Sequence, residues 1–256
     1  SMRGAPRTRR RWRAAASCPR SCFLGEVRGP LPTLSERYRK PADLPQRIPV
    51  FPLPRAILLP RATLPLNIFE PRYLEMIEDV MAGARVLGMV QPEGPEQEGF
   101  VPQDAPLRRI GCAGRVTAYE ELEDGRFAVT LTGVSRFTVT GEETAGKPYR
   151  VCTVDYGRFG RDLEAGAGED DVDRETLLKA LKAYLSARNL KADWSAVSRS
   201  SSEMLVNSLS LASPYGTEEK QALLEAETLK ARAEMLVALS EMELAAVGAG
   251  GAGTLQ

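Results

Sequence analysis

The stretch Leu66-Asn67-Ile68-Phe69-Glu70-Pro71-Arg72-Tyr73 marks the change from an extended pattern to a helical one. Upstream of it, from Arg47 onwards, prolines alternate with apolar residues. Because proline cannot donate a hydrogen bond to a β-ladder, this segment predicts edge strands or extended loops. Downstream, apolar residues recur at spacings of three and four up to Met81. A helix is therefore expected to begin at Pro71, which suits the first helical position, and to stop at Gly83.

Strand signals follow at regular spacing. The segments that carry them are residues 85–90, 110–120, 126–132, 136–140 and 149–156. Asp124-Gly125 fits the tip of a hairpin, since glycine readily adopts the positive φ that such turns need. The segment after it alternates Phe127, Val129 and Leu131, which is the period of a strand buried on one face. We expect a small, mostly antiparallel β-barrel or sandwich in this half.

The last third of the chain changes to helical periodicity. Before it, residues 157–171 are rich in glycine and acidic residues and predict a linker. Asp173 is a good N-cap for a first helix, and Thr217 is expected to cap a later one. Trp194 is expected in a short connecting turn between helices. Apolar residues continue to recur at helical spacing from there towards Val247, which favours a helical bundle.

The fold class expected is α+β, with a β unit followed by helices. The expected segments are a basic tail at 1–43, the β unit at 44–156, the linker at 157–171, the bundle at 172–247 and a frayed tail at 248–256. Charge is divided unevenly along the chain. Residues 1–40 carry ten Arg and one Lys against two Glu, a net charge of +9, which leaves the rest at −9. An acidic body repels the backbone of nucleic acids.

The basic tail has no periodic apolar face, so disorder is the first expectation. An organellar transit peptide, an export signal and a nucleic-acid-binding arm are the alternatives. No apolar run approaches the roughly 18 residues of a membrane span, so no membrane partner is expected. The four cysteines suggest no disulfide framework, which favours a cytoplasmic location.

Histidine is absent from the sequence, which excludes Ser/His/Asp and Cys/His nucleophile systems and histidine-ligated zinc. The segment Gly141 to Lys147 has the spacing of a phosphate-binding loop. However, Pro148 stands where a hydroxyl should bind Mg²⁺, and a strand pattern follows where a helix is needed. Cys18 and Cys22 form a lone pair, whereas a metal site needs about four ligands. The sequence thus predicts no enzyme, no metal and no cofactor.

Several segments, in order, resemble the N-terminal, substrate-binding domain of Lon proteases, which is also found in cereblon. The string from Leu66 to Tyr73 is the most specific of them. The others are residues 49–53, 59–60, 87–90, 111–116, 124–126, 133–137, 205–207 and 219–225. The resemblance runs from about Leu44 to Leu244 and implies a β half like the PUA fold, with a helical bundle behind it. It implies recognition of proteins without proteolysis, because no segment resembles Lon's ATPase or protease domains.

The function expected is a non-catalytic module that binds unfolded or exposed apolar protein segments, or an unidentified folded protein. Such a module needs an apolar concavity with a polar rim, expected between the β unit and the first bundle helix. Phe51, Leu53, Leu59 and Met89 are the candidate contacts, and the alternative is that all four belong to the core. RNA binding is the alternative function, because PUA-like folds often bind RNA, although the acidic body makes nucleic acid an unlikely partner.

The resemblance also implies a set of structural residues. They are Phe69, Glu70, Arg72, Tyr73, Arg126, Arg136 and Phe137. The charged members stand beside bulky apolar residues, which suits ion pairs that brace strands against helices. Removing one partner of a buried ion pair typically costs about 3–5 kcal/mol, so these residues are expected to matter for stability.

Overall fold

The computed structural model of the chain describes residues 33–94, 101–102, 104–143, 146–188 and 192–251. The described residues belong to one compact unit that begins at Thr33. Cys18, Cys22 and most of the basic tail lie outside the described residues. The expected start of the fold at residue 44 is therefore eleven residues too late by this division.

Residues 33–43 contain two short helices, α1 (Leu34–Arg37) and a 3₁₀ turn, η1 (Pro41–Asp43). Tyr38 between them is buried in a core cluster with Ile48 and Phe137. Its hydroxyl accepts a hydrogen bond of 3.0 Å from Arg115. This end of the fold was missed in the sequence because a single buried aromatic residue produces no periodicity.

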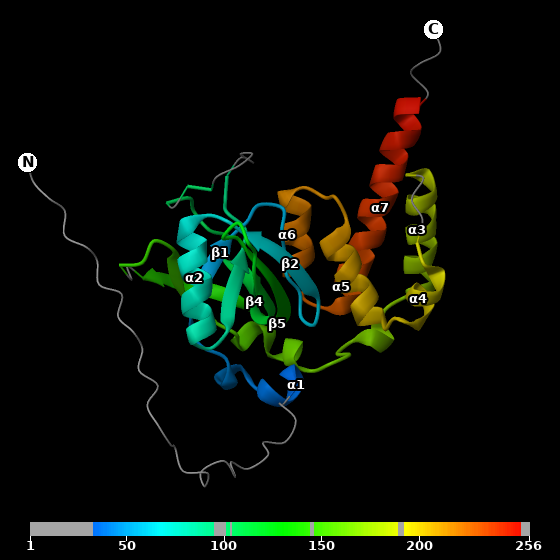
Figure 1. Ribbon diagram of the computed structural model, residues 1–256. Coiled ribbons are helices and arrows are strands. Elements are labelled where there is room, and N and C mark those ends of the chain that lie inside the picture. The colour runs from blue at the N-terminus through cyan, green and yellow to red at the C-terminus, as the bar shows by residue number, and fades with distance from the viewer. Residues whose placement is uncertain (1–32, 95–100, 103, 144–145, 189–191, 252–256) are drawn as a thin grey trace, which may run out of the picture. The chain divides into compact units, whose positions relative to one another are not determined.

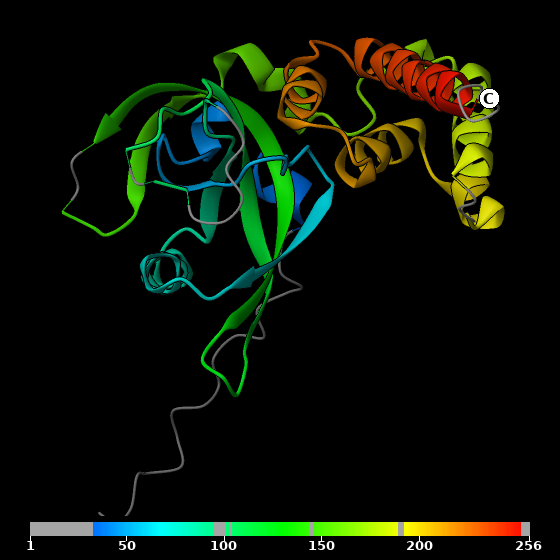
Figure 2. The same cartoon turned by 90° about the horizontal axis from the view of Figure 1, so that it is seen from above.

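The β half contains six strands within the described residues. They are β1 (Arg47–Pro52), β2 (Thr63–Ile68), β3 (Val86–Val90), β4 (Ile110–Glu121), β5 (Phe127–Glu143) and β6 (Arg150–Asp155). The strand order is β2-β5-β4-β3-β1-β6, and β5 also pairs with β6. These pairings close a ring of β5, β4, β3, β1 and β6, with β2 attached outside it (Figures 1 and 2). Among the strands of the described residues, only β1 and β3 run parallel to each other. The expected α+β fold with a mostly antiparallel β unit is confirmed, and a likeness to the PUA fold stays a prediction.

The strand β1 lies inside the ring, which differs from the edge position that its prolines predict. It pairs with β6 over residues 47–50 and with β3 over residues 50–52. Each proline is therefore bordered by a paired strand on one side only: Pro49 by β6 and Pro52 by β3. β6 pairs with the first part of β1 and β3 with its last part, so each ladder contains only one of the two prolines. The edge strand within the described residues is β2, which carries the exposed Pro65.

The two strands expected at 126–132 and 136–140 form the single long strand β5. A register shift opposite Ala113 and Gly114 places Val134 as an extra residue in β5. Such a β-bulge breaks the alternation of side chains while the ladder continues. Gly133 stands at this point, and a Cβ added there would lie 2.0 Å from the carbonyl oxygen of Leu59. Only glycine permits this approach, through which the loop before β2 packs on β5.

The helix expected after the opening string is α2 (Pro71–Ala82), with Pro71 at its first position and Gly83 at its C-cap. This prediction is confirmed at both ends. Its buried face carries Tyr73, and the ring of Tyr73 lies 4.4 Å from the ring of Phe51, centroid to centroid. The helix thus covers the apolar side of β1, as Figure 2 shows with α2 seen end-on beside the strands.

The segment expected as a linker is folded. It forms two 3₁₀ helices, η2 (Gly157–Leu163) and η3 (Glu169–Asp171), and it buries Phe159 and Asp162. Glycine and acidic residues predicted a solvated linker, but Asp162 is buried because it is paired with Arg136. An acidic residue whose partner is distant in the sequence cannot be told from a solvated one by composition.

The helical half contains α3 (Arg174–Ala187), α4 (Trp194–Arg199), α5 (Ser202–Ala212), α6 (Thr217–Glu225) and α7 (Leu229–Gly251). Asp173 caps α3 through a bond to Thr176 N, as expected. Two details were wrong: Trp194 is the first residue of α4, and the N-cap of α6 is Gly216. Thr217 is the first helical residue there, and it is buried. The apolar run beyond Leu223 belongs to two helices, because α6 ends before α7 begins.

Candidate functional site

A network of polar side chains joins the β half to the helices, and it is centred on Arg136 of β5. This side chain is 4% exposed. It donates to both carboxylate oxygens of Asp162, at 2.8 and 2.9 Å, and to the carbonyl oxygens of Leu224 and Ala226 at the end of α6. Its guanidinium also stacks on the ring of Phe159 at 4.4 Å. Arg136 therefore ties one strand to η2 and to a helix end.

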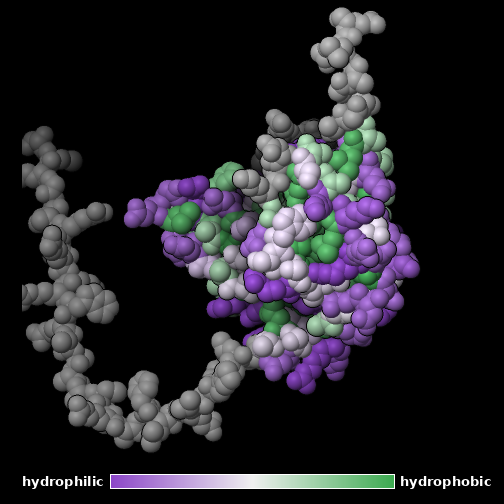
Figure 3. All heavy atoms as spheres, turned by 90° about the vertical axis from the view of Figure 1, so that its right-hand side faces the viewer, coloured by the Kyte–Doolittle hydropathy of each residue, from purple (hydrophilic) through white to green (hydrophobic). Residues whose placement is uncertain are grey.

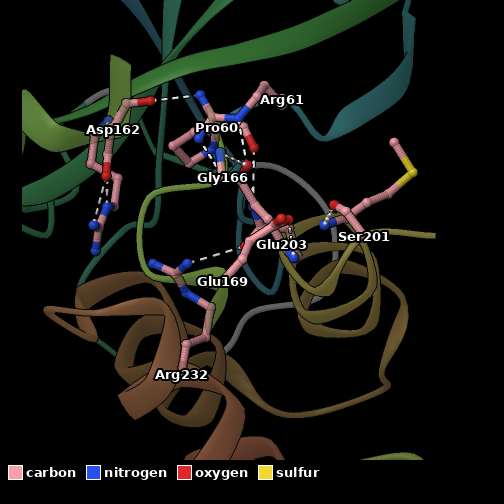
Figure 4. A network of polar contacts seen from close by, with 11 residues as sticks. Pro60, Arg61, Asp162, Gly166, Glu169, Ser201, Glu203 and Arg232 are labelled. Carbon is pink, nitrogen blue, oxygen red and sulfur yellow. Dashed lines mark hydrogen bonds and ion pairs between the residues drawn. The ribbon is translucent and has the colours of Figure 1, made fainter. Parts of the chain in front are cut away.

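A second arginine extends the network to α5. Arg61 forms an ion pair with Glu203 and donates to the carbonyl oxygen of Asp162 at 2.7 Å (Figure 4). The carboxylate of Glu203 also accepts from the backbone N–H of Gly166 at 3.0 Å. The N–H of Glu203 itself donates to Glu169 at 2.9 Å, and hydrogen bonds from Ser201 and this N–H lower the pKa of Glu169.

A third arginine, Arg232, joins α7 to the same network. Its Nε donates to the carbonyl oxygen of Leu223 at 2.8 Å, and one terminal nitrogen donates to the side chain of Asn207 at 3.1 Å. The amide of Asn207 donates in turn to the carbonyl oxygen of Pro60 at 3.0 Å. We call Arg61, Arg136, Asp162, Glu203, Asn207 and Arg232 the junction network. Among them, only Arg136 and Asn207 lie in the segments that carry the family resemblance.

The remaining structural candidates lie in different surroundings. Arg72 donates to Glu70 at 3.0 Å and stacks on the neighbouring ring of Tyr73 at 4.5 Å. Arg126 pairs with Asp124 within the same hairpin turn, and both side chains are about half exposed. This ion pair joins two residues of one turn and does not brace a strand against a helix. Phe137 is fully buried, whereas Phe69 is 65% exposed.

The four candidate peptide contacts do not form a surface. Phe51, Leu59 and Met89 are buried within one core cluster, and the partly exposed Leu53 packs against it. The first three side chains therefore serve the core, and Leu53 keeps a partly exposed surface.

The segment with phosphate-loop spacing belongs to a hairpin. Gly141 lies in β5 and pairs with Thr153 of β6, and residues 144–145 lie outside the described residues. The ammonium of Lys147 forms ion pairs with Asp79 at 2.8 Å and Glu75 at 3.4 Å, both on α2. These hydrogen bonds raise the pKa of Lys147. The lysine is held by α2, and β6 follows it, so the helix that would cradle phosphates is not formed here.

An apolar groove opens in the helical half, between α3, α5 and α7. Its volume is about 230 Å³. We call it the helical groove, defined by Leu177, Leu181, Leu185, Leu209, Pro214 and Leu236. Arg188 and Ser240 also line it, and Arg188 pairs with Glu243 of α7 at 2.7 Å. Figure 3 shows hydrophobic side chains at the surface of this half, set among polar ones.

A larger cavity of about 520 Å³ lies between the start of β2 and α5. Its lining includes Arg61, Thr63, Glu169 and Glu203, with the exposed Met204 beside them. This is the position closest to the concavity expected between the β unit and the bundle. The helix that contributes is α5 and not the first bundle helix, and charged side chains make the cavity more polar than the helical groove.

Within the described residues, no helix combines the length and the apolar character needed to cross a membrane. Residues 47–240 match the family described as the substrate-binding domain of ATP-dependent protease La (LON). The chain belongs to this family. The resemblance first indicated by residues 66–73 is thereby confirmed.

Full-length relatives place the match within much longer proteins. The chain is 27% identical to a Lon protease of Flavobacterium johnsoniae over 211 residues, which are 79% of this chain and 25% of that protein. It is 26% identical to Lon protease 2 of Myxococcus xanthus, over 77% of this chain and 24% of that protein. The chain therefore spans about a quarter of the length of these relatives.

Two solved structures share the fold. One is the crystal structure of a Lon N-terminal domain protein from Xanthomonas campestris, with a TM-score of 0.53 and 21% identity, covering 75% of this chain and 97% of that one. The other is the N-terminal domain of a Mycobacterium avium complex Lon protease, with a TM-score of 0.55 and 18% identity, covering 76% and 98%. At these identities, the likeness shows the fold.

Proposed function

We propose that this Lon-family domain is a non-catalytic module that binds exposed apolar protein segments, and that the helical groove receives them. The observation that carries the proposal is the lining of the groove, in which leucines from three helices face a common opening. Membership in a substrate-binding family supports the class of partner. The interior of the ring of strands is the poorer candidate for a binding site, because its apolar side chains are already buried against one another.

The size of the groove indicates what it holds. Its volume of about 230 Å³ is below the roughly 300–1,000 Å³ of typical pockets for drug-sized ligands. It suits one or two apolar side chains of a chain that passes across the surface. Flexible segments lose conformational entropy when they are ordered, so binding is expected to be micromolar or weaker.

Polar residues at the rim of the groove would let it bind unfolded segments of different amino-acid sequence. Arg188 and Ser240 are polar groups beside an apolar floor: the guanidinium of Arg188 can donate to backbone carbonyl oxygens of any segment, and the hydroxyl of Ser240, which donates to Leu236, can accept from backbone N–H groups. Apolar contacts below and hydrogen bonds at the rim would favour an unfolded chain over a folded one. A folded protein keeps both its apolar side chains and its backbone groups inside.

The test compares a denatured model protein with its native form. Each is titrated into the ¹⁵N-labelled chain, and amide shifts are followed by NMR. We expect saturable shifts of groove residues with the denatured form and none with the native form. The groove variant is Leu185→Asp, a partly exposed position on α3, and we expect it to weaken binding by about tenfold, which is 1.4 kcal/mol.

The matched control is Ala183→Asp, which adds the same charge at an exposed position of the same helix outside the groove lining. It should bind like the wild type. An equal response to native and denatured forms, or none to either, contradicts the proposal. Equal weakening by both variants would place the binding surface outside the groove.

A further inference from the structure

Arg232 has a hydrogen-bonding group that the junction network does not use. The residue is 3% exposed, and its second terminal nitrogen, NH2, is buried without a hydrogen-bond partner among the described residues. Its other two nitrogens are satisfied by Leu223 and Asn207. The nearby carboxylates are engaged elsewhere, Asp162 by Arg136 and Glu203 by Arg61. A buried charged donor without a partner is costly, which makes it the place to look for a ligand.

Arg232 lines a cavity of about 120 Å³ at the junction of η2, η3 and α7. The cationic side chains around it are Arg61, Arg136, Arg158, Arg161, Lys230 and Arg232, and the acidic ones are Asp162, Asp171, Glu203 and Glu227. Six cations against four anions leave a positive surplus. Burial, with Arg136 nearby, lowers the pKa of Arg232 to about 10, so the guanidinium stays charged at neutral pH.

The N-terminus of α7 opens onto the same cavity. Thr228 accepts a hydrogen bond from Ala231 N through its hydroxyl at 3.1 Å and one from Arg232 N through its carbonyl at 3.1 Å. The N–H groups of Leu229 and Lys230 precede this first helical bond, and both residues line the cavity. The dipole of a 23-residue helix adds a partial positive charge at this end.

We propose that this cavity binds a small inorganic oxyanion of the phosphate or sulfate type. Arg232 NH2 would donate from the floor, the first turn of α7 from the side, and Lys230 from the rim. Figure 4 shows the side chain of Arg232 extending from its helix towards the other labelled residues of this network. The volume is far below that of a nucleotide-sized pocket, so the bare anion is the ligand that fits.

An anion at this position would hold α7 against the two 3₁₀ helices and stabilise the junction. Ligands that bind only the folded state raise stability with their concentration. The site is independent of the proposed binding of apolar segments, because none of the residues that define the helical groove lines this cavity. Either proposal can therefore fail without the other.

The experiment titrates phosphate and sulfate into the full chain by calorimetry, with chloride at matched ionic strength and a phosphoserine peptide as further arms. We expect saturable binding of phosphate and sulfate, a higher melting temperature with either, and no such effect with chloride. Phosphoserine should bind weakly, since the attached chain does not fit. If phosphoserine binds more tightly than phosphate, the ligand is a modified protein and the proposal is overturned.

Two variants locate the site. Lys230→Gln should weaken phosphate binding about fivefold, whereas Lys182→Gln, an exposed lysine of α3 outside the cavity, should leave it unchanged. Arg232→Met should abolish binding. Because Arg232→Met removes two internal hydrogen bonds and can impair folding, Lys230→Gln decides the outcome. Absence of saturable binding in the wild type, or equal affinity in Lys230→Gln, overturns the proposal.

Discussion

The β half and the helical half of this domain use their apolar side chains in different ways. In the β half, residues such as Leu59, Met89 and Phe137 are fully buried, in core clusters that pack against the ring of strands. In the helical half, leucines from three helices leave a groove, and Trp194 and Met204 are exposed. A closed ring fixes the distance of each strand from its neighbours, whereas helices joined by short turns can leave space between them. The difference suggests a rigid frame that carries an adaptable binding surface.

The junction network connects the two, and the largest expected effect concerns Arg136. We expect Arg136→Ala to lower stability by about 3–5 kcal/mol, because it leaves the carboxylate of Asp162 buried without its partner. For a domain of this size, that corresponds to a fall in melting temperature of roughly 6–20 °C. Arg126→Ala is the control, since it removes a solvent-exposed pair that should contribute little to stability. Melting of Arg136→Ala within a degree of wild type would show that the two halves do not depend on this ion pair.

The rigidity of the frame is tested at Gly133. We expect Gly133→Ala to destabilise the protein by about 1–3 kcal/mol, because the new Cβ would meet the backbone of Leu59 at 2.0 Å. Gly141→Ala, on the same strand, is the control, because a Cβ there meets nothing within 4 Å. Urea denaturation of both variants measures the effect. If the two variants are equally stable, the loop before β2 is not packed as tightly as the structure shows.

The sequence was informative where the signal was local. Pro71, Gly83 and the apolar spacing between them gave both ends of α2, and the specific string beside them gave the family. It was less informative where partners are distant, as for Arg61 and Glu203, which are 142 positions apart. The closure of the ring depends likewise on the pairing of β1 with β6, which are distant in the sequence and which no local pattern joins.

The helical groove was missed for a related reason. Leu177, Leu209 and Leu236 each have the ordinary spacing of core residues within their own helices. Only the packing of three helices decides that they face an opening. Of the residues chosen from the sequence as peptide contacts, Phe51 and Met89 lie in strands and are buried in one core cluster with Leu59, whereas Leu53 stays partly exposed. Periodicity identifies an apolar face, but it does not show what covers that face.

A smaller effect is expected from Lys220 of α6, which is buried and donates to Ser210 and Leu211 carbonyl oxygens at the end of α5. Burial lowers its pKa to about 8 from 10.5. Above pH 8, the folded state loses this proton before the unfolded state does, so stability should rise with pH through the window from about 8 to 10. Urea midpoints at several pH values measure the rise, and Lys220→Met should remove it. A flat profile in the wild type would mean that the two carbonyl oxygens fully compensate for burial.

The smallest effect is expected at Phe69, which lies between β2 and α2 and is 65% exposed. Phe69→Ser should change stability by no more than about 0.5 kcal/mol, as is usual for exposed positions without a special role. Tyr73→Ala, in the same string, is the matched comparison: its ring is buried against Phe51, and truncating a buried aromatic residue costs about 3–5 kcal/mol.

Comparing Phe69→Ser with Tyr73→Ala shows whether each aromatic residue of the motif serves packing or binding. If Phe69→Ser is as damaging as Tyr73→Ala, Phe69 packs in solution and the frame extends further than the structure shows. If Phe69→Ser is stable but binds denatured protein less tightly, the β half contributes a contact to the bound segment. Binding would then not be confined to the helical half. Single exposed apolar residues are common on protein surfaces, so unchanged stability and unchanged binding are the expected result. That result would leave recognition to the helices alone.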